Sequence, residues 1–249
     1  MKYGFIKVAA AIPSVKVADT QYNLAEIEKQ VIIAEGEGVE IIVFPELSLT
    51  GYSCQDLFHQ QILLDNIETS VIQLLDFTRQ LDITVIVGAP ICADSVLLNC
   101  ALVIQHGKLI GIVPKTYLPN YGEFYEKRWF ASSQDLQFQS IYYVGEKITI
   151  SSDIQLFTTS QGVKFGIEIC EDLWAPIPPS NQLTLAGAEL IFNLSASDDL
   201  IGKHNYLKSL LTQQSARTIS GYIYSGCGFG ESTQDVVYGG NGLDRKSVV

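Results

Sequence analysis

Positive charge is scarce in this sequence of 249 residues, which has 16 Lys and Arg against 27 Asp and Glu and a formal net charge of −11. Proteins that bind nucleic acid neutralise phosphates with clustered Lys and Arg. The sequence contains no such cluster, so we expect no nucleic-acid partner. Charged residues make up only 17% of the chain and hydrophobic residues 47%, which excludes a disordered chain and predicts a globular core.

Long hydrophobic segments are also absent. No apolar run reaches the roughly 20 residues that cross a bilayer. The apolar start FIKVAAAI is followed by Pro13 and a polar stretch, without a cationic leader or a signal-type cleavage pattern. We therefore expect no membrane association and a cytoplasmic location, where thiols remain reduced.

Paired cysteine motifs are missing and histidines are few. The five cysteines form no CxxC pair and have no histidine nearby at metal-ligand spacing, so neither a disulfide framework nor a metal site is expected. Of the three histidines, His106 lies in the hairpin turn predicted below, and His59 and His204 follow no predicted strand. This argues against a protease that pairs cysteine with histidine.

Short apolar runs rich in β-formers recur through the chain. Each is bounded by Pro, Gly or polar residues, and they read FIKVAAAI, EIIVFPEL, ITVIVGAP, LLNCALVIQ, KLIGIVPK, VKFGIEIC, AELIFNLS and YIYSGCGFG. Helical patterns lie between several of them, at 23–37 with Asn23 as the cap, at 65–80 and at 203–220. This alternation predicts an α/β protein, and nothing divides residues 1–249 into more than one domain.

Two further stretches refine this prediction. The run NCALVIQHGKLIGIV turns at His106 and Gly107 like a hairpin, so antiparallel pairs are expected within the sheets. Residues 117–145 form the longest part without a clear period, and long loops in compact domains are usually functional or disordered. The many aromatic residues of this stretch favour an ordered segment.

Three chemically reactive side chains directly follow predicted strands. Glu46 and Lys115 each stand behind a proline, and Cys170 ends the run VKFGIEIC. The ligand crevice of an α/β sheet lies at the carboxyl ends of its strands. Each residue alone has a simpler interpretation, because a loop Glu or Lys is more often a solvated charge and a buried Cys more often an inert hydrophobe. Their shared placement predicts that they converge on one crevice.

A carboxylate, an ammonium and a thiol suffice for acyl transfer from an amide. A thiol, with its usual pKa of about 8.5, needs a base at neutral pH, and a partly desolvated carboxylate can serve. Glu46 is the candidate base, and it would also give a proton to departing ammonia and then activate water. Lys115 and the backbone N–H of Glu171 are the candidates to stabilise the charge that develops on the carbonyl oxygen.

Read together, the segments FPELSLTGY, PKTYLPNYGEFYEKRWF and GIEICEDLW give the chain a resemblance to a known family. The chain resembles the nitrilase, or carbon–nitrogen hydrolase, superfamily, and more closely the amino-terminal glutaminase domain of bacterial glutamine-dependent NAD synthetases. The resemblance covers nearly the whole chain and implies a four-layer α-β-β-α sandwich. It implies that Glu46 is the general base, Lys115 the oxyanion lysine and Cys170 the nucleophile. It also implies that Glu126, which reasoning from the residues does not single out, positions these groups.

The resemblance further implies contacts to L-glutamine. Tyr121 matches a loop tyrosine near the substrate, Ser197 a serine that recognises its amino-acid end, and Lys203 a cation that can meet its α-carboxylate. Glu171 is included in this substrate-binding set. Ser197 is equally consistent with a helix cap or turn serine.

No cofactor is implied for the glutaminase reaction. ATP and deamido-NAD are implied only for a separate carboxyl-terminal synthetase domain, which would be the partner that receives the ammonia, and a homo-oligomer is implied as well. The sequence departs from the family at Asp198 and Asp199, where a proline or aromatic residue often follows the serine. It also ends at DRKSVV without an SGGxDS-type phosphate loop, so an excised domain, a fragment and a free-standing amidase are all consistent with it.

Two other functions remain open. A stand-alone ω-amidase, nitrilase or carbamoylase would use the same residues on another amide. A non-enzymatic binding module would have kept the sandwich as a scaffold, and the presence of all three catalytic residue types argues against it.

Overall fold

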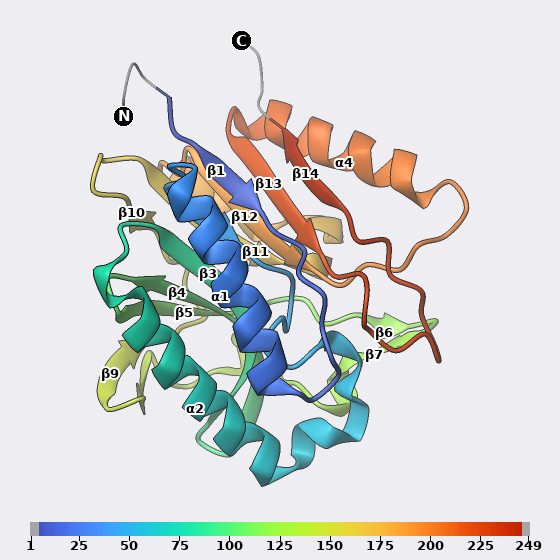
Figure 1. The fold of residues 1–249 in the computed structure, drawn as a ribbon. Helices are drawn as coiled ribbons and strands as arrows, with labels where there is room; N and C mark the ends of the chain where they lie inside the picture. The colour runs from blue at the N-terminus through green and yellow to red at the C-terminus, as the bar shows by residue number, and fades with distance from the viewer. Residues whose placement is uncertain (1–4, 246–249) are drawn as a thin grey trace.

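The computed structural model describes residues 5–245, so the first four residues and the last four, which include most of the DRKSVV ending, lie outside the described residues. Two five-stranded sheets pack face to face (Figure 1). The first has the order β1-β2-β3-β4-β5, with bounds Val8–Ala10, Ile41–Val43, Thr84–Ala93, Val96–Gln105 and Lys108–Pro114. The second has the order β10-β11-β12-β13-β14, with bounds Phe157–Thr158, Lys164–Ile169, Leu190–Ser195, Gly221–Gly226 and Gly242–Arg245.

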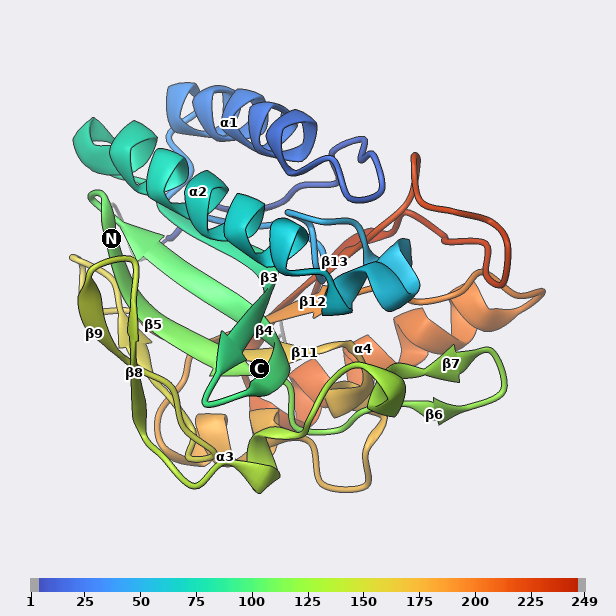
Figure 2. The ribbon, with the colours of Figure 1, turned by 90° about the horizontal axis from the view of Figure 1, so that it is seen from below.

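Helices cover the outer faces of both sheets. The α-helices are α1 (Thr20–Gly36), α2 (Gln61–Phe77), α3 (Pro179–Leu185) and α4 (Lys203–Thr218). Short 3₁₀ helices η1 to η5 span Tyr52–His59, Thr78–Gln80, Glu126–Arg128, Ser133–Asp135 and Cys170–Trp174. Figure 2 shows α1 and α2 on one side of the molecule and α3 and α4 on the other, with the two sheets between them.

The burial pattern explains why the sheets form two inner layers. In β2, Ile41 and Val43 lie in the core between the sheets, whereas Ile42 lies in the core beneath α1 and α2. Successive side chains of a strand point to opposite faces, so a strand covered on both sides is apolar throughout. A third core lies between the second sheet and α3 and α4 and contains Leu183 and Leu211. The predicted α-β-β-α sandwich is confirmed.

Strand directions are mixed in both sheets, as the sequence predicted. Strands β1, β2 and β3 are parallel, and β3, β4 and β5 are antiparallel. The predicted turn at His106 and Gly107 joins β4 to β5, and both residues have positive φ. A Cβ on Gly107 would lie 2.8 Å from the carbonyl oxygen of Leu75 in α2, so the close approach of this turn to the helix requires glycine.

The predicted start of the first helix is wrong. Helix α1 begins at Thr20, and Asp19 is the cap, because its carboxylate accepts a hydrogen bond from the backbone N–H of Tyr22. Asn23 is buried inside the helix and bonds to the main chain of Lys16 and of Leu49. An asparagine just before an apolar stripe is typical of a helix cap. Here, however, the side-chain amide of Asn23 hydrogen-bonds to two loops and holds them against the helix.

The other helices and the long aperiodic stretch differ less from expectation. The helix predicted at 65–80 begins four residues earlier, at Gln61, and continues past Phe77 as η2. Residues 117–145 contain hairpin β6–β7 (Asn120–Tyr121 and Phe124–Tyr125), η3, η4 and strand β8 (Ser140–Tyr143), which pairs with β9 (Glu146–Thr149). Within residues 5–245, no helix is both long enough and apolar enough to span a bilayer.

Candidate active site

Three predicted site residues from separate parts of the chain form a buried charge cluster. The Nζ of Lys115, just beyond β5, lies 2.6 Å from Oε1 of Glu46 and 2.7 and 2.9 Å from the two carboxylate oxygens of Glu126. All three side chains are at most 1% exposed. A buried charge is tolerated only when it is paired and hydrogen-bonded, and here one ammonium serves two carboxylates.

This shortage of positive charge alters the titration of the cluster. Burial, opposed by Lys115 and reinforced by Glu46, raises the pKa of Glu126 to about 7. Burial alone would lower the pKa of Lys115, but Glu126 and Glu46 more than offset it, so the ammonium form persists far above neutral pH. The cluster therefore holds a fixed cation and, near neutrality, an exchangeable proton.

Glu46 has one carboxylate oxygen engaged and one free. Oε1 accepts hydrogen bonds from Lys115 and, at 2.7 Å, from Nδ2 of Asn99. Oε2 is buried and has no hydrogen-bond partner among residues 5–245. A buried acceptor without a partner costs free energy unless a donor reaches it during function. This oxygen is therefore an acceptor of the cluster that remains open to a hydrogen-bond donor.

Cys170 lies at the end of β11 in a strained turn. Its φ is +47°, a conformation that non-glycine residues seldom adopt and that is often found at functional sites. The backbone N–H of Cys170 donates to Oδ1 of Asn193 at 3.3 Å, and Asp172 accepts N–H groups from Ile169 at 2.9 Å and from Tyr117 at 2.7 Å. These contacts fix the turn to β12 and to the segment after Lys115.

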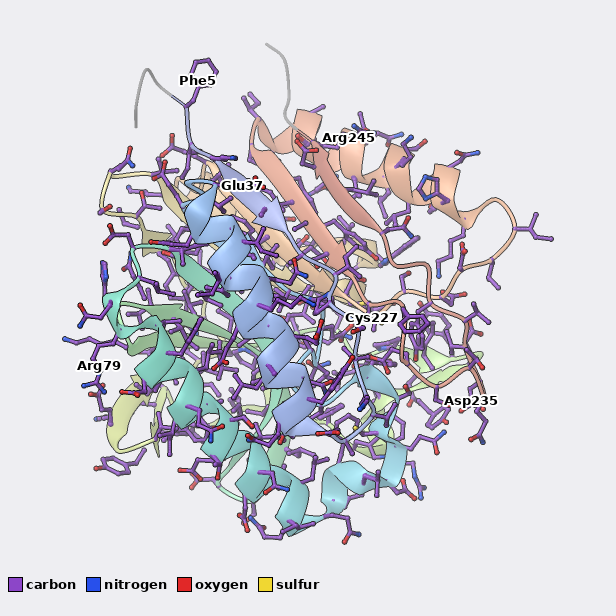
Figure 3. All side chains as sticks on the ribbon, in the orientation of Figure 1. Phe5, Glu37, Arg79, Cys227, Asp235 and Arg245 are labelled. Atoms are coloured by element: carbon purple, nitrogen blue, oxygen red, sulfur yellow. The ribbon has the colours of Figure 1, made fainter. Side chains whose placement is uncertain are left out.

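The thiol of Cys170 is protonated at rest. Its side chain is buried, and burial, followed by the negative charge of Glu46, raises its pKa far above the usual value, although Lys115 opposes the shift. A thiol in this environment becomes a nucleophile only when a base removes its proton as it reacts. Cys227, which follows β13 (Figure 3), is also buried, but it does not line the pocket described next.

Cys170 opens onto a pocket of about 440 Å³. The four residues predicted to bind substrate all line it: Tyr121, Glu171, Ser197 and Lys203. They come from hairpin β6–β7, from η5, from the segment between β12 and α4, and from the first residue of α4. The Tyr121 hydroxyl lies 2.9 and 3.0 Å from the two carboxylate oxygens of Glu171, and Nζ of Lys203 pairs with Oδ1 of Asp198.

Residues 7–241 match the carbon–nitrogen hydrolase family. This chain belongs to that family. Over 241 residues it is 37% identical to a glutamine-dependent NAD(+) synthetase of Mycobacterium bovis, with 96% of this chain and 35% of that protein covered. The solved glutamine-dependent NAD(+) synthetase of Cytophaga hutchinsonii has a TM-score of 0.85 at 27% identity, with 97% of this chain and 39% of that chain covered. The resemblance drawn from the three motifs is thereby confirmed.

A solved amidase has a similar fold to this carbon–nitrogen hydrolase. An amidase of the nitrilase superfamily from Nesterenkonia has a TM-score of 0.77 at 16% identity, with 97% of this chain and 82% of that chain covered. The present chain thus spans most of an amidase of this fold but only 35% of the length of the mycobacterial synthetase.

Sequence reasoning missed three residues that support the site of this carbon–nitrogen hydrolase. Asn99 holds Glu46, the Tyr52 hydroxyl donates to Glu126 at 2.7 Å, and Asp172 holds the turn at Cys170. Asn99 is a polar residue within the apolar run LLNCALVIQ, and this interruption of the apolar pattern could have pointed to a functional role. Tyr52 and Asp172 lie inside the quoted motifs, but nothing in their spacing distinguishes them from neighbouring polar residues.

Proposed function

We propose that this chain hydrolyses the side-chain amide of L-glutamine through a thioester on Cys170. The observation that carries the proposal is the buried cluster of Glu46, Lys115 and Glu126 near a cysteine that opens onto a pocket lined in part by carboxylates and an ammonium. An amidase needs a base for the thiol and a fixed cation for the oxyanion, and this cluster supplies both.

The steps follow from the groups present. The sulfur of Cys170 attacks the carboxamide carbon while its proton passes to Oε2 of Glu46, and Lys115 stabilises the oxyanion together with the backbone N–H of Glu171. The C–N bond then breaks as Glu46 returns the proton to the leaving nitrogen, which releases ammonia and leaves a thioester. Water, deprotonated by Glu46, attacks the thioester, and the returning proton regenerates the thiol as glutamate departs.

The remaining part of the proposal concerns the longer protein. The chain spans 35% of the length of the mycobacterial synthetase, so we infer that it is the single glutaminase domain of such a protein. The rest of that protein would use the ammonia to amidate deamido-NAD at the expense of ATP. A reducing compartment such as the cytoplasm suits a free thiol nucleophile.

The test is glutamate release from glutamine without ATP, measured for the wild type and for Cys170→Ala. We expect the substitution to abolish activity, a loss of at least about 1000-fold, because no other group can form the thioester. Cys92→Ala is the matched control, since Cys92 is exposed, and it should retain wild-type activity. Retained activity in Cys170→Ala would refute the proposal, and a preference for a nitrile, an N-carbamoyl compound or a dicarboxylate monoamide over glutamine would select a stand-alone amidase.

A further inference from the structure

Glu168 is a fully buried carboxylate two residues before Cys170, and the proposed reaction does not use it. It lies in β11 and faces α3, where the backbone N–H of Ser180 donates to its Oε2 at 2.7 Å. Its Oε1 accepts the hydroxyl of Tyr222, which lies in β13. Burying a carboxylate costs free energy even when its oxygens accept hydrogen bonds, and an apolar side chain at this point would avoid that cost.

Asn193 continues this set of hydrogen bonds to the main chain of Cys170. It is buried in β12, directly opposite Glu168 in the strand register, and its Nδ2 lies 3.0 Å from the Tyr222 hydroxyl. Its Oδ1 accepts the backbone N–H of Cys170 at 3.3 Å. A continuous chain of hydrogen bonds therefore runs from the carboxylate of Glu168 to the main chain of the proposed nucleophile.

The carboxylate gives this chain of hydrogen bonds a direction. An ionised carboxylate can only accept, so the hydroxyl of Tyr222 donates to Glu168 and the hydroxyl oxygen is left to accept from Asn193. The NH₂ end of the Asn193 amide then faces Tyr222, and its oxygen end faces the N–H of Cys170. If the amide turned over, two N–H groups would meet at Cys170, and that backbone donor would lose its acceptor.

We propose that Glu168 and Asn193 are positioning residues, which hold the backbone of Cys170 in the conformation that catalysis requires. This inference rests on the proposed function. Cys170 has a φ of +47°, a conformation that persists only where the surrounding structure holds it. The N–H of the next residue, Glu171, is the proposed oxyanion donor. A fixed N–H at Cys170 therefore helps to fix both the sulfur and that donor, and a small misplacement of reacting groups can cost about 100-fold in rate.

The test uses Glu168→Gln, which keeps the shape of the side chain but turns one of its two acceptor positions into a donor. The amide oxygen can then face Ser180 or Tyr222 but not both. We expect kcat for glutamine hydrolysis to fall at least about tenfold and KM to stay within about twofold of the wild-type value, because Glu168 does not line the pocket. Tyr222→Phe removes only the connecting hydroxyl and should give the same pattern.

Ser180→Ala is the matched control. It removes a buried hydroxyl that accepts from Gln214 but keeps the backbone N–H that donates to Glu168. It should lower the free energy of unfolding, as the other two substitutions do, and leave kcat within about twofold of the wild-type value. Urea denaturation identifies conditions in which every variant is folded.

Three results would overturn the inference: an unchanged kcat in either Glu168→Gln or Tyr222→Phe, a loss that lies in KM, or an equal fall of kcat in Ser180→Ala. If the wild type prefers another small amide to glutamine, the same comparison on that amide tests the inference apart from the proposed substrate. Hydrolysis of no amide by the wild type would refute the proposed function and the inference with it.

Discussion

At the scale of single residues, the site depends on an ammonium that is outnumbered by carboxylates. Lys115 is fully buried and contacts both Glu46 and Glu126, so the cluster would carry a net charge of −1 with all three groups ionised. Burial disfavours that state, which is why the pKa of Glu126 is raised to about 7. The tyrosine that donates to Glu126, Tyr52, is buried and neutral, so it cannot compensate the charge.

This raised pKa predicts a stability that falls as pH increases. Between about pH 4.5, where Glu126 titrates in the unfolded chain, and about pH 7, where it titrates in the folded chain, the native state holds a proton that the unfolded state has released. The free energy of unfolding should therefore decrease with rising pH in this window, by up to about 1.4 kcal/mol per pH unit for this group. Urea denaturation of the wild type and of Glu126→Gln at several pH values measures the effect.

The variant separates Glu126 from other groups. Asp172 and Glu168 are also buried acids with raised pKa values. Part of the decrease in the free energy of unfolding with rising pH should therefore persist in Glu126→Gln. An uncharged amide at position 126 does not titrate. The dependence of the free energy of unfolding on pH should therefore become shallower by the amount that one bound proton contributes. Identical slopes in the two proteins would show that Glu126 is ionised throughout this range.

The predictability of the site also differs from residue to residue. Glu46, Lys115 and Cys170 could be found from the sequence because each directly follows an apolar strand. Glu126 lies within the stretch 117–145, which has no clear period, and only the family motif pointed to it. Asn99 lies within β4, and its role depends on the packing that brings it beside Glu46. Such a contact is set by the tertiary structure and cannot be read from the local sequence.

At the scale of elements, the loop that carries Glu46 is fixed by close packing on β3. A Cβ on Gly88 would lie 2.2 Å from the backbone nitrogen of Leu47 and 2.7 Å from the carbonyl oxygen of Pro45. The three nearest atoms are all backbone atoms of residues 45–47, so no flexible side chain could move away. The position of Glu46 therefore depends on the absence of a side chain at this point of the strand.

Gly88→Ala should lower both stability and activity. We expect a loss of about 3 kcal/mol or more in the free energy of unfolding, because the added methyl group must displace the backbone of the 45–47 loop. The kcat should fall as well, since Glu46 moves with that loop. Gly36→Ala is the control, because nothing lies within 4 Å of the added Cβ at the end of α1, and it should change stability by less than about 1 kcal/mol. Equal effects of the two substitutions in urea denaturation would contradict this account.

Most elements of the sandwich could be predicted and a few could not. All eight apolar runs contain a strand, because strands buried on both faces are almost continuously apolar. The edge strands β10 and β14 were missed, since one has two residues and the other, GLDR, is half exposed and has a mixed composition. Hairpins β6–β7 and β8–β9 are equally short, and their pairing is set by tertiary contacts more than by local pattern.

At the scale of the whole molecule, the candidate site exists only where the two sheets meet. The first sheet supplies Glu46 and Lys115 from loops after β2 and β5, and the second supplies Cys170 and Ser197 from loops after β11 and β12. The inter-sheet core, which includes Ile41, fixes the distance between these two halves. The packing of the two sheets therefore brings the proposed base and cation near the proposed nucleophile.

The central claim is that Cys170 is a nucleophile activated toward glutamine-like substrates. The most direct measurement is mass spectrometry of the intact chain and its peptides after brief exposure to 6-diazo-5-oxo-norleucine, a reactive glutamine analogue. We predict a single adduct on Cys170 and none on Cys92, although Cys92 is the more exposed thiol. Absence of an adduct on Cys170 while that residue still reacts with iodoacetamide, or modification of Cys92 instead, would contradict the account.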